Sequence, residues 1–299
     1  MTARHRPDAV MNGKNSRAIG IFFVALSAVA FAFLPIFVHH AAAAGVTVLT
    51  MLALRFSLAS LGLCLIMGLR HETWPEGRRL PALIAMGGLG YAGMSFCFFT
   101  ALQYATAGLV SLLLYLYPAL VIILGRCFFR EKIRPAQVAA VIAAFCGTML
   151  IVGGGQEGSW LGVCLGLGAA LICAFYILAG SRVLKSESAL GSVTVICLSA
   201  ATVFTVAALF QGPSMPTGLT GWLAIFGIAA IATVLAMVSF FAGLARLPAA
   251  DAATVSTLEP VTTVMLATLL LREPLGWPKC LGGLIIVVAL VILARHKPS

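Results

Sequence analysis

Long apolar runs, separated by short polar or glycine- and proline-rich breaks, follow one another along almost the whole chain. A helix needs about 20 apolar residues to cross the roughly 30 Å hydrocarbon core of a bilayer. The runs have about that length, and in lipid only a helix satisfies the backbone hydrogen bonds of such a run internally. The pattern predicts ten spans: 18–38, 47–69, 80–101, 106–126, 136–153, 160–181, 190–211, 220–244, 249–271 and 276–294.

The composition agrees with this pattern. Of the 299 residues, 61% are hydrophobic and 9% are charged, whereas a soluble domain is roughly 45–50% apolar and about 25% charged. So large an apolar excess cannot be buried in one aqueous core, and the loops between the runs are too short to hold a soluble domain. We therefore expect an all-α, multi-pass membrane protein.

The N-terminal segment allows two interpretations. Seventeen polar and basic residues precede the first apolar run, 18–38, which is followed by "HHAAAAG". Signal peptides have this order, but their apolar region spans only about 7–15 residues. Because this run is longer and many more follow it, we expect an uncleaved first span and a cytoplasmic N-terminal tail, 1–17.

Basic residues are distributed unequally between the two sides that ten spans define. If the N-terminus is cytoplasmic, 16 of the 19 Lys and Arg residues fall in cytoplasmic loops and tails, Arg272 and Lys279 fall outside, and Arg55 lies within a span. Loops on the cytoplasmic side of membrane proteins are enriched in Lys and Arg. We therefore expect both termini in the cytoplasm, and an odd number of spans would break this distribution.

The chain repeats itself at a spacing of 142 residues with almost no gaps. Pro118 then falls on Pro260, and Arg-Glu at 130–131 falls on Arg-Glu at 272–273. Apolar matches between two Leu- and Ala-rich helices arise easily by chance, but proline and charged matches in one register do not. The sequence therefore predicts two related halves.

Each half, 18–153 and 160–295, contains five predicted spans. Because five is odd, the second half must enter the membrane upside down relative to the first. Inverted repeats with a site near the bilayer midplane, where the halves meet, are a recurring plan of secondary transporters. We expect such a carrier, with a central cavity exposed alternately to either side.

Three motifs resemble a known family. They are "LLREPLGWPKCLGGLIIVVALVIL" near the C-terminus, "ATAGLVSLLLYLYPALVIILGRCFFREKIRPAQ" in the first half, and "LRF" at 54–56. Over roughly residues 18–295 the chain resembles EamA-type transporters of the drug/metabolite transporter superfamily. The resemblance implies export of small metabolites, and exporters of aromatic and other neutral amino acids are the most similar. Other members handle drugs or sugars, so these substrates remain alternatives.

Two prolines lie inside predicted spans at equivalent positions of the halves. Pro118 and Pro260 each free the carbonyl four residues earlier, of Leu114 and Ser256, and kink the helix. Freed carbonyls are tolerated in a membrane only where protein or a water-filled cavity satisfies them. We interpret the prolines as paired hinges beside a cavity; a packing kink is the alternative.

Glu259 is the one carboxylate that the pattern places deep in an apolar run. A charged side chain at the bilayer centre costs about 2.5–3.5 kcal/mol on insertion scales, so it should face the interior, be paired or be protonated. It could bind a substrate ammonium group or couple transport to protons. A structural hydrogen bond at the kink is the other interpretation.

Arg55 lies about nine residues into the second span. An arginine there could hold a substrate carboxylate with two parallel hydrogen bonds. It could instead pair with Glu259 or extend to the headgroup region.

Other polar and aromatic residues could form the wall of a cavity. Some recur at helical spacing on one face of their span, and aromatic rings could stack on an aromatic or apolar substrate. Interhelical hydrogen bonds and ordinary packing are the alternatives. The candidates are Ser111, Tyr115, Ser256, Tyr91, Tyr176 and Phe33.

Several other classes of protein lack support in the sequence. All five histidines lie at chain ends or span boundaries, and eight cysteines are scattered without a CxxC motif, so we expect no metal, no cofactor and no enzyme. No GxxxxGK[ST] motif is present for ATP-driven transport. The net charge is +10, but the chain has no soluble basic segment that would indicate binding to nucleic acid. We therefore expect a carrier of the inner (plasma) membrane that is not driven by ATP and that could also transport protons. A passive channel is the alternative.

Overall fold

The computed structural model of this chain describes residues 7–77, 79–129, 135–153, 158–183, 189–244, 246–247, 252 and 255–295. These residues form helices and no β-strand. The all-helical prediction is therefore confirmed for the described part of the chain.

Helices of the first half follow the predicted spans 18–38 to 136–153. They are α1 (Pro7–Ala32), α2 (Leu34–Ala43), α3 (Val48–Arg70), α4 (Arg79–Ala85), η1 (Met86–Tyr91), α5 (Ala92–Ala101), α6 (Ala107–Leu114), α7 (Tyr117–Phe129) and α8 (Pro135–Gly153), of which η1 is a π-helix.

Helices of the second half follow the predicted spans 160–181 to 276–294. They are α9 (Trp160–Val183), α10 (Ala189–Gln211), α11 (Gly218–Phe226), the π-helix η2 (Gly227–Leu235), α12 (Ala236–Leu244), α14 (Leu258–Leu270) and α15 (Trp277–Arg295). Of the span predicted at 249–271, residues 249–251 and 253–254 lie outside the described part.

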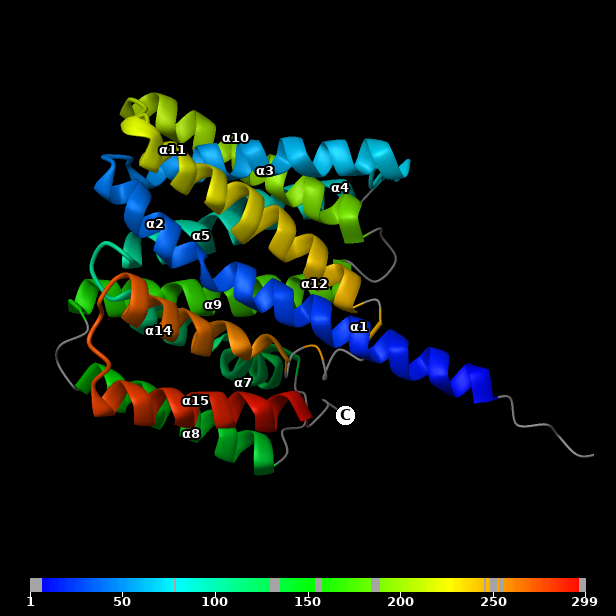
Figure 1. The fold of residues 1–299 in the computed structure, drawn as a ribbon, viewed down its shortest axis with the longest axis vertical. Helices are drawn as coiled ribbons and strands as arrows, with labels where there is room; N and C mark the ends of the chain where they lie inside the picture. The colour runs from blue at the N-terminus through cyan, green and yellow to red at the C-terminus, as the bar shows by residue number, and fades with distance from the viewer. Residues whose placement is uncertain are drawn as a thin grey trace, which may run out of the picture.

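Seven stretches of the described chain are long and apolar enough to cross a membrane, the first being Ser16–Ala43 and the last Gly218–Gly243. Shorter apolar helices, Val138–Ile151, Leu258–Leu270 and Trp277–Ile292, lie in the other predicted spans. In Figure 1 the start of α1 and the end of α15 lie on the same side of the bundle, as an even number of passes requires.

The first predicted span ends too early and misses a break. Helical structure continues beyond residue 38, through His39 and His40 to Ala43, and it is interrupted at Phe33. Pro35 lies in the first turn of α2, where its missing N–H leaves no intrahelical bond unmade. The break therefore sits just before a proline that the sequence analysis did not use.

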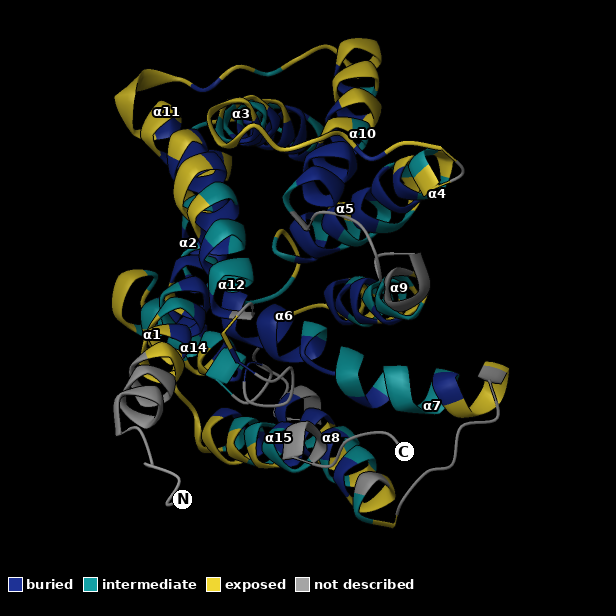
Figure 2. Ribbon diagram, turned by 90° about the vertical axis from the view of Figure 1, so that its right-hand side faces the viewer, coloured by how far each residue is buried: buried dark blue, intermediate teal, exposed yellow. Residues whose placement is uncertain are grey.

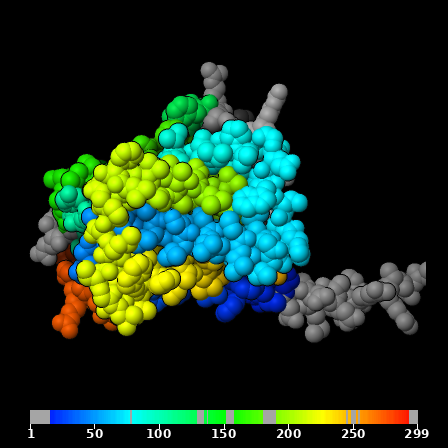
Figure 3. Space-filling view, turned by 90° about the horizontal axis from the view of Figure 1, so that it is seen from above, coloured from blue at the N-terminus to red at the C-terminus, as the bar shows by residue number. Residues whose placement is uncertain are grey.

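Helices of one half pack mainly on helices of the other. α3 packs along α10, α8 along α15, α1 along α12, and α5 along α9. Figure 1 shows these pairs side by side. Figure 3 shows that α3 lies between α10 and the continuous helical stretch α11–η2–α12 on one face of the molecule. The interior is thus built between the halves.

Burial follows this arrangement, with buried residues turned toward the middle of the bundle and exposed ones outward (Figure 2). Large apolar side chains cover the outside: Leu89 is 78% exposed, and Phe210 is 89% exposed. Apolar patches of this kind are rare on soluble monomers. The outer surface is therefore suited to lipid.

Gly282 and Gly147 let α15 and α8 approach each other closely. A Cβ atom on Gly282 would lie 2.5 Å from the Gly147 carbonyl oxygen, which forces the helices apart. We expect Gly282→Ala to lower the free energy of unfolding by about 1–3 kcal/mol, measured as a fall in melting temperature in detergent. Gly283→Ala is the matched control, because its Cβ would first meet Leu112 at 3.7 Å; equal losses in both variants would contradict this account.

Candidate functional site

A cavity of about 330 Å³ lies between the two halves. Residues of α1, α2, α3, η1, α5, α6 and α7 line it from the first half, and residues of α9, α10, α12 and α14 from the second. None of the described residues that line it comes from α8 or α15. Seven of the residues singled out in the sequence line this cavity: Arg55, Tyr91, Ser111, Tyr115, Tyr176, Ser256 and Glu259.

Phe33, the remaining cavity candidate, is not among the lining residues. It forms the break between α1 and α2, and its ring stacks on Phe37 with centroids 5.8 Å apart. The aromatic wall includes Phe31 and Phe240. At the spacing of 142 residues Phe33 falls on Phe175, but this match does not indicate the direction in which the Phe33 ring points.

Glu259 lies in the first turn of α14 and is held by Tyr115. The Tyr115 hydroxyl donates to the Glu259 carboxylate at 2.7 Å and also lies 3.1 Å from the Ser256 carbonyl oxygen. This contact joins the fourth helical stretch of one half to that of the other. It satisfies one oxygen of a carboxylate whose residue lines the cavity.

The helices are interrupted beside the two prolines, at equivalent places. α6 ends at Leu114 and α7 begins at Tyr117, so Pro118 occupies the first turn of α7; Pro260 occupies the first turn of α14. Residues at the breaks line the cavity and the prolines do not: Tyr115, at the break between α6 and α7, is a lining residue, whereas Pro118 is not. The Ser256 carbonyl, expected to be freed by Pro260, is the one that Tyr115 approaches.

Arg55 is buried on α3, with 3% of its surface exposed. Its Nε donates to the Thr233 hydroxyl at 3.0 Å, and its guanidinium carbon lies 4.9 Å from the Phe56 ring centroid. It therefore does not extend to the headgroup region. No ion pair joins it to a carboxylate in the described part of the chain.

The two π-helical segments also line up between the halves. Shifted by 142 residues, η1 falls on residues 228–233 of η2, and Tyr91 falls on Thr233. π-Helical turns are rare and frequently occur at functional sites. Here each presents a polar side chain beside the cavity: Tyr91 lines it, and Thr233 holds Arg55.

Sequence reasoning missed part of the wall, above all Tyr117 and Ser95. Tyr117 aligns with Glu259 in the repeat, and that alignment was the available signal. Ser95 gave none, because a single serine in an apolar helix is ordinary.

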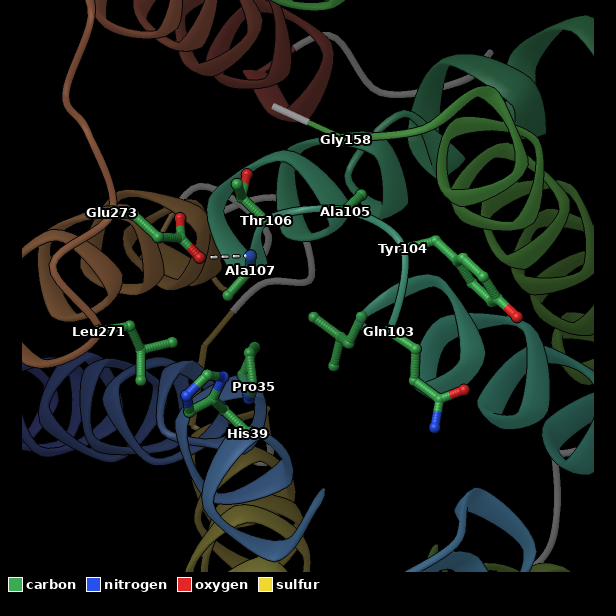
Figure 4. Close-up of a pocket in the computed structure, with 11 residues that line it drawn as sticks. Pro35, His39, Gln103, Tyr104, Ala105, Thr106, Ala107, Gly158, Leu271 and Glu273 are labelled. Atoms are coloured by element: carbon green, nitrogen blue, oxygen red, sulfur yellow. Dashed lines mark hydrogen bonds between the residues drawn. The ribbon is translucent and has the colours of Figure 1, made fainter. Parts of the chain in front are cut away.

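A second pocket of about 360 Å³ lies at the end of the bundle away from the start of α1, and Pro35 lines both pockets (Figure 4). At its edge Glu273 accepts hydrogen bonds from the backbone N–H of Ala107 at 2.6 Å and of Gly108 at 3.2 Å. Lys279 donates to the same carboxylate at 3.1 Å. We call these contacts the Glu273 clamp.

The Glu273 clamp ties the segment between α14 and α15 to the start of α6. A carboxylate at a helix N-terminus complements the helix dipole. Lys279 falls on the outer side in the predicted distribution of basic residues and within the predicted span 276–294, and its side chain is buried, with 2% of its surface exposed. The sequence signal that could have found the clamp is the second Arg-Glu pair, at 272–273, because Glu273 belongs to it.

No group of three or more His, Cys, Asp or Glu side chains that could hold a metal occurs within the residues that the structure describes. The chemistry of the site is thus that of one carboxylate, one guanidinium, hydroxyls and aromatic rings.

The chain resembles known transporters along most of its length. The model of the EamA-like transporter family matches it twice, at residues 18–153 and 160–295. An uncharacterized transporter YetK of Bacillus subtilis is 26% identical over 82% of this chain and 78% of its own. The aromatic amino acid exporter YddG of Ancylobacter novellus is 26% identical over 68% and 70%. One solved crystal structure, 19% identical, matches 93% of this chain and 96% of its own with a TM-score of 0.67.

Proposed function

Since the chain belongs to the EamA-like transporter family of the drug/metabolite transporter superfamily, we propose that it exports small metabolites across the inner (plasma) membrane as a secondary carrier. Aromatic or other neutral amino acids are the proposed substrates. The observation that carries this proposal is a cavity between the halves that combines Arg55, Glu259 and several aromatic rings.

The cavity supports an amino acid on three grounds. Its volume of about 330 Å³ lies within the roughly 300–1,000 Å³ of small-molecule sites. Aromatic side chains such as Tyr176 and Phe240 can stack on an aromatic ring. A cation and a carboxylate among the lining residues match the two charges of an amino acid. The name of the similar exporter from Ancylobacter novellus points the same way.

The proposed mechanism is alternating access between two inverted five-helix halves, with ten spans and both termini in the cytoplasm. Support comes from the reciprocal packing: α1 lies on α12 as α5 lies on α9, and α6 lies on α14. Inverted halves of this kind rock around a fixed central site. The Glu273 clamp would have to break for the cavity to open to the side away from the termini.

One observation favours a different substrate class. A single carboxylate among aromatic rings also suits a lipophilic cation, as in a multidrug exporter. The buried guanidinium of Arg55 in the same cavity opposes a cationic ligand, so this function is the second candidate.

Uptake into proteoliposomes tests the proposal. Purified protein would be given labelled aromatic, aliphatic and cationic amino acids, a labelled lipophilic cation and a labelled sugar. We expect saturable uptake of aromatic or neutral amino acids that unlabelled competitors inhibit. Uptake of the lipophilic cation alone, by protein shown to be folded, would favour the second candidate and reject the first.

Pro118 offers a test of the hinge. In Pro118→Ala the restored N–H can bond the carbonyl four residues earlier and join α6 to α7. A stiffer helix should lower the maximal uptake rate several-fold and change the half-saturating concentration less. Pro135→Ala, at the start of α8 and away from the cavity, is the control. Equal maximal rates in Pro118→Ala and wild-type protein would remove the hinge from the mechanism.

A further inference from the structure

Arg55 is a buried cation whose charge is not matched by a carboxylate in the described part of the chain. The Glu259 carboxylate takes the Tyr115 hydroxyl, and the Glu273 carboxylate takes Lys279 and two backbone N–H groups. Buried charges in proteins are normally paired, because desolvation penalises an isolated charge. The position of Arg55 therefore needs a partner that the described chain does not supply.

The guanidinium of Arg55 is nevertheless held in place. Thr233 donates its own proton to the Ile228 carbonyl at 2.8 Å, so its oxygen is left to accept from Arg55 Nε. The rings of Phe56 and Phe99 lie 4.9 and 5.3 Å from the guanidinium carbon. A guanidinium carries five N–H donors, and this bond uses one. The four remaining N–H donors of Arg55 are the ones that a ligand in the cavity could use, because Arg55 lines the cavity.

The Ser95 hydroxyl is a second polar group in the same cavity that lacks a partner in the described part of the chain. Its side chain is 2% exposed, lines the cavity and has no hydrogen-bond partner among the described residues. It lies four residues after Tyr91 and four before Phe99, so the three share one helix face. The Arg55 guanidinium lies over the Phe99 ring, which places Ser95 on the helix face that Arg55 packs against.

We propose that Arg55 and Ser95 form a carboxylate-binding subsite in the cavity, so that the transported molecule must carry a carboxylate. Two guanidinium amino groups match the two oxygens of a carboxylate, and the Ser95 hydroxyl adds a third donor. The proposal rests on the proposed function, because it takes this cavity as the transport site. It narrows the substrate to carboxylates and excludes amines, sugars and lipophilic cations.

Sequence symmetry explains why the subsite occurs once. Shifted by 142 residues, Arg55 falls on Cys197 and Ser95 falls on Met237. Neither can bind an anion as a guanidinium does. The anion-binding group thus lies on one side of the cavity only. A bound amino acid would therefore have one preferred orientation, with its carboxylate toward α3.

Binding of four matched compounds to purified protein tests the subsite separately from transport. The compounds are L-phenylalanine, 3-phenylpropionate, L-phenylalaninamide and phenethylamine, of which the first two carry a carboxylate. Affinity is read from the rise in melting temperature with ligand concentration. We expect the two carboxylates to bind at least about tenfold more tightly than the amide and the amine, as for a charged hydrogen-bonded group.

Variants assign the preference to the two residues. Arg55→Met should weaken the binding of both carboxylates by about 10- to 100-fold. It should leave the binding of the cationic amide and amine as tight as before or tighter, because the guanidinium that repels them is gone. Arg55→Lys should keep part of the preference, and Ser95→Ala should weaken the carboxylates a few-fold, which keeps the test valid if Arg55→Met does not fold. Equal binding of L-phenylalanine and its amide, no binding of either carboxylate, or an unchanged preference in Arg55→Met would overturn the proposal. Carboxylate binding without uptake would instead reject the transport function and leave the subsite standing.

Discussion

Replacing Glu259 with glutamine is expected to abolish the accumulation of substrate that a pH gradient drives, while the protein remains folded. Glu259 is the one acid among the described residues that line the cavity. Glutamine has the same shape and can still accept the Tyr115 hydroxyl through its amide oxygen. It cannot ionise, so it can neither carry a proton across nor balance an ammonium group.

Two readouts separate the two roles of Glu259. If it couples transport to protons, Glu259→Gln loses the response to the pH gradient but keeps exchange of labelled for unlabelled substrate. If it binds the ammonium group, the half-saturating concentration rises by about 10- to 100-fold in both assays. A variant that keeps gradient-driven accumulation and its affinity would contradict both roles.

Tyr115→Phe and Glu76→Gln are the controls for Glu259→Gln. Tyr115→Phe removes the hydrogen bond but leaves the carboxylate, so we expect a smaller loss. Glu76→Gln removes an exposed carboxylate in the loop after α3 and should behave as wild type. A loss in Glu76→Gln as large as in Glu259→Gln would show that the effect is not specific to the cavity.

Replacing Glu273 with glutamine is expected to open the cavity to the side away from the termini. The change weakens the cap on α6 and removes the carboxylate that the Lys279 ammonium, on a side chain 1% exposed, contacts at 3.1 Å. Removing one partner of a buried ion pair typically costs about 3–5 kcal/mol, which corresponds to about 100- to 4,000-fold in an equilibrium. That cost falls on the clamped state, in which Lys279 is buried.

Accessibility of a cysteine introduced in place of Ser111 measures this opening. Ser111 lies on α6 and lines the cavity. In a variant with the native cysteines replaced, we expect a membrane-impermeant thiol reagent to modify Ser111→Cys at least about tenfold faster when Glu273→Gln is present. Lys279→Met in addition should restore part of the closure, because it removes the buried ammonium that contacts the Glu273 carboxylate in the wild-type protein. Equal modification rates with and without the Glu273→Gln change would contradict a clamp that controls access.

Periodic apolar runs made the membrane-helix arrangement predictable from the sequence. Length and hydrophobicity fix where a helix can cross lipid, and the described helices follow the predicted ranges closely. The structure differs most from the prediction where the conformation depends on contacts between particular side chains. The break at Phe33 depends on Pro35, and the burial of Lys279 depends on Glu273 from a neighbouring turn.

The candidate site could be predicted only in part. Glu259 and Arg55 were found because a charge in an apolar run is costly and therefore conspicuous. Which way a ring or a hydroxyl turns depends on the packing of several helices, so Phe33 was included and Ser95 was missed. The π-helical segments that bring Thr233 to Arg55 have no simple signature in the sequence.

Counterflow in proteoliposomes tests most directly whether one central site serves both sides. Vesicles would be loaded with a high concentration of the unlabelled amino acid that gives the fastest uptake, and labelled substrate would be added outside at low concentration. An alternating-access carrier predicts that the label rises transiently above its equilibrium level inside and then declines. A label that only approaches equilibrium, at a rate independent of the internal substrate, would contradict the account and indicate a passive channel.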